Sequence, residues 1–89
     1  MMKTIIFNDC CVCWSKNYMF NKSFIEHQIR YIYDLICVQG YIYLDKIYGL
    51  FGTRWDPHEP NDVLIFGENE PVISYKHLDG GDFKISICY

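Results

Sequence analysis

The chain contains no alanine among its 89 residues. The interior must therefore be filled by bulky side chains, and the sequence supplies twelve isoleucines, eight tyrosines and six phenylalanines. Each of these buries a large apolar surface, which offsets the high surface-to-volume ratio of a short chain. The length predicts a single domain, residues 1–89.

Clusters of positive charge are also missing. The chain has eight scattered Lys and Arg residues and eleven Asp and Glu residues, which give a formal net charge of −3. Nucleic-acid binders neutralise phosphates with clustered cations, so we expect no direct DNA or RNA binding. Residues 53–89 carry seven acidic residues against three basic ones. A charge imbalance of this kind suits contact with a basic partner.

No apolar run is long enough for a membrane-spanning helix or a secretory leader. The five cysteines are an odd number, and three of them lie within four residues, which is unlike a secreted disulfide framework. We therefore expect a cytoplasmic protein with reduced thiols and no membrane association.

A complete metal-binding motif is absent. Cys10 and Cys13 have the spacing of a zinc-binding or redox pair. A structural zinc needs four ligands, and no second paired motif follows, so Cys37, Cys88 or a distant histidine would have to complete the site. We predict no cofactor and keep a zinc-stabilised small domain as an alternative.

A catalytic signature is absent as well. Asp56, His58, Glu59 and Asp62 lie close together in a proline-bounded loop, but their spacing matches no zinc or calcium motif. Cys13 could be paired with a histidine as nucleophile and base only in a fold that the sequence does not reveal. We predict that the protein is not an enzyme.

The clearest secondary-structure signal is an amphipathic helix over residues 23–38. Isoleucines recur at helical spacing, Ser23 and Glu26 have the spacing of a capping box, and Gly40 supplies the stop. The isoleucines are Ile25, Ile29, Ile32 and Ile36. Before this helix we expect a strand over residues 3–7 and a short helical segment from Asn8 or Asp9 to about Tyr18.

The segment from Gly40 to Pro57 predicts a short strand, a short helix over residues 44–51 and an abrupt end. In a helix-turn-helix protein a second helix follows and contacts the bases. Here the chain enters an extended, polar loop over residues 53–62, in which Pro57 and Pro60 lack backbone donors. A degenerate winged-helix-like nucleic-acid-binding module, with helix 44–51 touching DNA, is therefore only the alternative.

Residues 62–89 have the pattern of a β meander with strands near 63–66, 72–76 and 83–88. The predicted fold class is α+β: one main amphipathic helix plus a short helix packed on a small antiparallel meander of about three strands. Residues 1–52 form the mainly helical part. The 83–88 strand is a candidate free edge, through which the protein could form a homodimer.

Sixteen aromatic rings cannot all be buried in so small a domain, and exposed Tyr and Trp commonly anchor protein interfaces. We therefore expect a protein partner to bind an acidic, aromatic-containing surface. Its predicted residues are Tyr41, Tyr43, Trp55, Asp56, Glu59, Asp62, Glu68 and Glu70.

Two neighbouring stretches of the chain have a combined pattern of aromatic and aliphatic residues. They are Tyr33-x-Leu35-Ile36 and Gly40-Tyr41-Ile42-Tyr43-Leu44-x-x-Ile47-Tyr48-x-Leu50-Phe51-Gly52. Together they resemble a pattern in small uncharacterised accessory proteins of phages and mobile elements. The resemblance covers about a third of the chain. It implies a helix, a strand and a short helix before a small sheet, and it supplies no catalytic residues. It also implies an accessory protein that binds a host or phage protein, for example an inhibitor of a host defence or nucleic-acid-handling protein.

Overall fold

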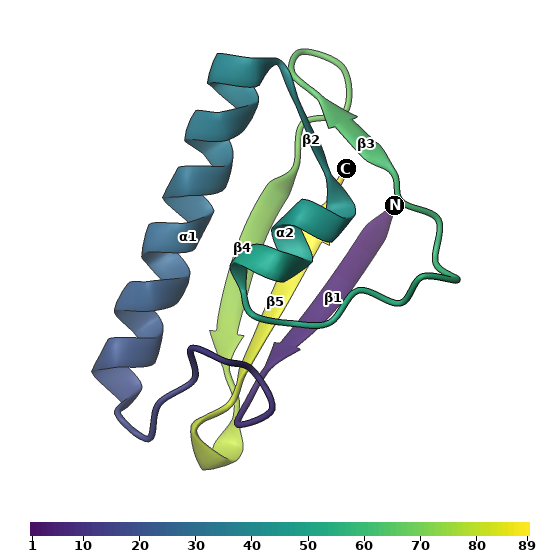
Figure 1. Cartoon of the computed structure of the whole chain (residues 1–89). Coiled ribbons are helices and arrows are strands. Elements are labelled where there is room, and N and C mark those ends of the chain that lie inside the picture. The colour runs from purple at the N-terminus through teal and green to yellow at the C-terminus, as the bar shows by residue number, and fades with distance from the viewer.

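The computed structural model describes all 89 residues and contains two helices and five strands (Figure 1). In chain order these are β1 (Met2–Phe7), α1 (Tyr18–Gln39), β2 (Tyr41–Tyr43), α2 (Leu44–Leu50), β3 (Val63–Ile65), β4 (Val72–His77) and β5 (Phe83–Cys88). A short 3-10 turn, Asp79–Gly81, joins β4 to β5. The predicted α+β class, with one long and one short helix on a small antiparallel sheet, is confirmed.

The strands form two antiparallel sheets. The larger has the order β1-β5-β4, and the smaller pairs β2 with β3. The predicted strand positions are right, but β3 leaves the meander to pair with β2, and β1 takes the third place beside β5. The prediction that residues 83–88 form a free edge is wrong, because β5 is the central strand and bonds on both sides.

Helix α1 begins five residues earlier than the sequence pattern suggests. Asn17 is the N-cap, and its side chain accepts the Phe20 N–H at 3.1 Å. The predicted capping box of Ser23 and Glu26 is therefore wrong, because Ser23 lies inside the helix. The helix ends as predicted at Gly40, whose φ of 85° is accessible mainly to glycine.

The segment between β1 and α1 is built from turns, so the predicted short helix over residues 8–18 is wrong. A buried polar side chain explains the difference. Asn21 is only 1% exposed, and its amide bonds both the N–H of Ser15 at 2.8 Å and the carbonyl of Ser15 at 2.6 Å. This contact ties the connection to the first turn of α1 and satisfies two backbone groups outside a helix.

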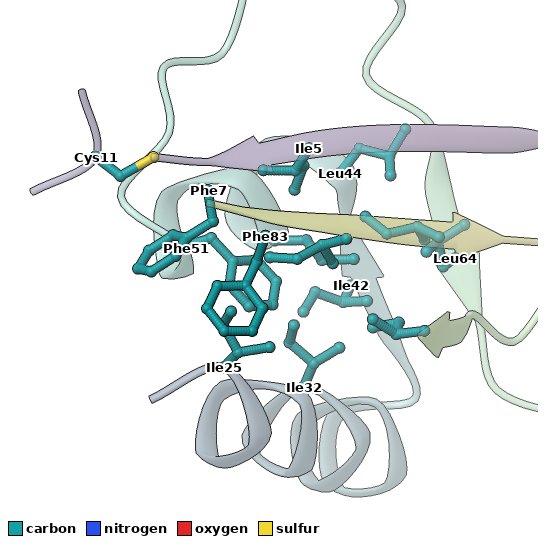
Figure 2. Packing of buried hydrophobic residues seen from close by; sticks show 14 of the residues in the cluster. Ile5, Phe7, Cys11, Ile25, Ile32, Ile42, Leu44, Phe51, Leu64 and Phe83 are labelled. Carbon is teal, nitrogen blue, oxygen red and sulfur yellow. The ribbon is translucent and has the colours of Figure 1, made fainter. Parts of the chain in front are cut away.

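The hydrophobic core lies between the large sheet and the two helices, which cover the same face of the sheet (Figures 1 and 2). Of the predicted isoleucine stripe on α1, Ile25, Ile32 and Ile36 are buried, and Ile29 is partly buried at the edge of the core. The core residues that pack against α1 come from the strands and from α2. Three phenylalanines, Phe7, Phe51 and Phe83, lie together at one end of the core. Such complete burial of large apolar side chains is the main stabilising contribution.

The other face of the large sheet is open. Its outward-pointing side chains form three rows across the strands: Met2, Cys88 and Val72; Thr4, Ser86 and Ser74; and Ile6, Lys84 and Lys76. Eight of these nine residues are exposed, and Ser86 in the middle is partly exposed. The predicted alternation of β5, with Phe83, Ile85 and Ile87 inward, is confirmed.

The loop from Thr53 to Asp62 contains no helix, as the prolines predict. Its end is tied to α2, because the Asn61 side chain accepts the Asp45 N–H at 3.0 Å and the Asp62 carbonyl accepts the Leu44 N–H. No second helix is available for insertion into a DNA groove after α2. Neither helix is both long and apolar enough to cross a lipid bilayer.

Candidate protein-binding surface

Two exposed tyrosines mark the free edge of β2. Tyr41 and Tyr43 flank the buried Ile42, and each of the two residues remains 46% exposed. The rings meet edge to face with centroids 5.9 Å apart and an interplanar angle of 80°. This geometry is favourable between aromatic rings, so the two side chains present a preorganised aromatic pair to solvent.

The backbone of β2 is also available along this edge. Leu44 and Gly40, which flank the strand, hydrogen-bond to Asp62 and Phe66 on the β3 side. Because backbone groups alternate in direction along an antiparallel pair, the N–H and C=O groups of Tyr41 and Tyr43 point away from β3. No strand of this chain therefore covers the β2 edge of the small sheet.

A hollow of about 320 Å³ lies beside the tyrosines. Its walls come from three elements: Leu35 and Gln39 of α1, the whole of β2, and Asp45 and Lys46 at the start of α2. We call these residues together the β2 tyrosine surface. It combines aromatic, aliphatic, amide and charged groups, which is the mixture found at protein interfaces.

The predicted acidic residues lie at opposite ends of β3 and are largely engaged within the chain (Figure 1). Before the strand, Glu59 forms an ion pair with Lys3 at 3.3 Å, and Asp62 accepts the Tyr89 hydroxyl at 2.6 Å. Asp56 accepts the N–H of His58 two residues further along, at 2.9 Å.

After the strand, Glu70 accepts the Gly67 N–H at 2.7 Å and closes the β3–β4 turn. Glu68 is exposed in the same turn, where its N–H donates to the Ile65 carbonyl and its carboxylate makes no hydrogen bond. The acidic sequence region is thus divided between two connections, and most of its carboxylates hold loops in place.

Trp55 is less available than the sequence suggests. It is partly buried, and its ring packs edge to face on Tyr48 of α2 with centroids 4.9 Å apart. The indole therefore packs the 53–62 loop against the edge of the core. Tyr41 and Tyr43 are the more exposed aromatic members of the predicted site.

The cysteines do not assemble a metal centre. Cys10 and Cys13 are both exposed, and no group of three or more His, Cys, Asp or Glu side chains gathers in a metal-binding arrangement. Cys11 is the buried member of the cluster, with its sulfur 3.3 Å from the Thr53 hydroxyl oxygen. The zinc-stabilised alternative therefore lacks an assembled ligand set within the chain.

Sequence reasoning missed a second surface. Tyr33 of α1 and Ile73 and Tyr75 of β4 line a larger groove on a different part of the molecule. Nothing local in the sequence indicates that these residues are neighbours, because forty positions separate Tyr33 from Ile73.

Comparison with known proteins finds no matching family model, no matching curated protein and no matching solved structure.

Proposed function

We propose that this protein is a non-enzymatic accessory protein that binds a protein partner through the β2 tyrosine surface. The observation that carries the proposal is the exposed, edge-to-face pair of Tyr41 and Tyr43 on an uncovered strand edge. Tyrosine buries a large area on binding at a low cost in side-chain entropy, and it is enriched among the residues that dominate interface energies.

Acidic residues at the two ends of β3 would contribute to partner choice. Exposed Glu68 and Glu70 follow β3, and Asp56 and Glu59 lie in the loop before it. A basic partner surface would be attracted to them, and such attraction raises the association rate and the specificity more than the final affinity.

The biological setting is proposed from the resemblance to accessory proteins of phages and mobile elements and from the acidic composition. In that setting the protein acts in the host cytoplasm, and its partner is a host defence or nucleic-acid-handling protein with a basic surface.

The test compares proteins captured from host-cell extract by the immobilised wild type and by a Tyr41→Thr, Tyr43→Thr double variant. Threonine keeps the preference for a strand while it removes both rings. The matched control is Tyr31→Thr, which removes an exposed tyrosine from α1. Far-ultraviolet circular dichroism checks that each variant is folded.

A stoichiometric protein partner that is retained by the wild type and the control but lost by the double variant supports the proposal. Equal retention by all three contradicts it. Capture of nucleic acid that weakens steeply as salt is raised would instead favour the winged-helix-like alternative.

A further inference from the structure

The free edge of β4 carries backbone groups that pair with no other strand. Ile73 lies opposite Ile87 of β5, yet its N–H donates at 3.0 Å to the hydroxyl of Tyr33 on α1. At the other end of the pairing between β4 and β5, the Leu78 N–H donates to the Asp82 carbonyl at 2.7 Å. Even-numbered positions therefore bond to β5, and Ile73 and Tyr75 direct their N–H and C=O groups outward.

A groove of about 520 Å³ runs between this edge and α1. Glu26, Ile29, Arg30 and Tyr33 form the helix side, and residues 73–75 form the strand side. Figure 1 shows α1 running beside β4, one of the two outer strands of the large sheet. An edge strand beside a helix, with apolar side chains between them, is the arrangement into which an extended peptide adds as a strand.

Positive charge borders the groove on the helix side. Arg30 lines it, and Lys22 lies close enough to the Tyr75 hydroxyl to oppose the upward shift that burial and Glu26 cause in the pKa of that group. Glu26 is the one acidic residue in the lining.

Positive charge also lies on the open face of the large sheet, beside the same edge of β4. Lys76 follows Tyr75 on β4, and Lys84 lies directly opposite it on β5. The chain's single ion pair joins Lys3 to Glu59, so Lys22, Arg30, Lys76 and Lys84 form no ion pair within the chain. Two like charges directly opposite each other destabilise a sheet, and an acidic ligand would relieve that repulsion.

We infer that the groove binds an extended, acidic segment of a protein partner, which adds to β4 as a fourth strand of the large sheet. The carbonyl groups of the segment accept the outward N–H groups, including that of Ile73 in place of Tyr33. Its alternate side chains point to opposite faces. Apolar ones lie against Ile29, and acidic ones lie on the open face beside Lys76.

This surface shares no lining residue with the β2 tyrosine surface, so the inference stands independently of the proposed function. The probe is a synthetic, end-capped peptide of four glutamate–valine repeats, titrated into the full chain and followed by fluorescence anisotropy and amide hydrogen exchange. The expected result is saturable binding with a dissociation constant well below about 1 mM. The bound peptide should also slow hydrogen exchange at the Tyr75 N–H.

Charge reversal tests the site. Arg30→Glu and Lys76→Glu should each weaken binding about tenfold. Lys46→Glu makes the same change in net charge at the other surface and should leave binding unchanged, as should the Tyr41→Thr, Tyr43→Thr variant. A lysine–valine peptide should not bind.

Four results would overturn the inference. These are absence of binding at about 1 mM, equal weakening by Lys46→Glu, tighter binding of single-stranded nucleic acid than of the peptide, and a concentration-dependent dimer that excludes the peptide from β4.

Discussion

The hydroxyl of Tyr33 on α1 accepts the backbone N–H of Ile73 on β4 at 3.0 Å, and so a helix residue satisfies a hydrogen-bond donor that an adjacent strand would otherwise satisfy. β4 is the outer strand of the large sheet, and an uncovered edge invites association with another chain. The contact secures one position of the edge and leaves the groove beside it open.

The first prediction concerns this hydrogen bond. Tyr33→Phe removes the acceptor and should lower the free energy of unfolding by about 0.5–1.5 kcal/mol. We expect the lower end of this range, because Tyr33 is 37% exposed and water can reach the donor. Urea denaturation measures the loss, and the Ile73 amide should exchange faster. Tyr31→Phe is the control, and an equal effect there would contradict the assigned role.

The second prediction concerns Tyr89. Burial, together with the hydrogen bond to Asp62 and the charge of that residue, raises the pKa of the Tyr89 hydroxyl from about 10 to about 12. Between these values the unfolded chain loses the proton while the folded chain keeps it. The contribution of Tyr89 to stability should therefore be fully present below about pH 10 and be lost as the pH rises towards 12.

Tyr89→Phe isolates this contribution from that of the other tyrosines. Titration of tyrosinate absorbance should show one fewer group ionising near pH 12, and the urea midpoint should fall less steeply with pH above 10 than it does in the wild type. Identical slopes for the two proteins would show that Tyr89 is not the group responsible.

The third prediction compares alanine substitutions at two glycines, Gly40 and Gly49. An added Cβ meets nothing within 4 Å at either Gly40 or Gly49, so space does not distinguish them. Gly40 has a φ of 85°, and Gly40→Ala should cost about 1–2 kcal/mol for the left-handed backbone. Gly49 lies inside α2, and Gly49→Ala should stabilise the protein by about 0.5–1 kcal/mol.

Thermal unfolding of the two single variants tests the pair. Shifts of the melting temperature in opposite directions are expected. Destabilisation by both substitutions would mean that α2 does not have the backbone described.

The fourth prediction concerns thiol reactivity. Cys10, Cys13, Cys37 and Cys88 are exposed, and Cys11 is buried next to Ile6 and Thr53. A small alkylating reagent should label four thiols in the native protein and the fifth only after unfolding, because burial restricts access. Peptide mass spectrometry identifies the protected residue, and rapid labelling of Cys11 would contradict its placement.

Several elements follow from local sequence alone. The isoleucines at helical spacing predict the buried stripe of α1, and Gly40 predicts its end because few other residues adopt that φ. Pro57 and Pro60 predict that no helix follows α2, since proline removes backbone donors. The exposure of Tyr41 and Tyr43 around buried Ile42 agrees with the alternation of a strand.

Two other features were not predicted from the sequence. The start of α1 was missed because Ser23 has the right local chemistry, while the bonds between Asn21 and Ser15 and the Asn17 cap decide the boundary. The acidic residues formed one cluster in the sequence, but β3 separates them in space.

Apart from the connection before α1 and the first residues of that helix, the sequence by itself determined which segments become helix, strand and loop, because side-chain periodicity and backbone preferences act over a few residues. Only the tertiary structure decided that β1 pairs with β5, that β3 pairs with β2, and that Tyr33 meets Ile73 beside an open groove. Strand partners and grooves are selected by the packing of the whole core, in which residues far apart in the chain compete for the same apolar contacts.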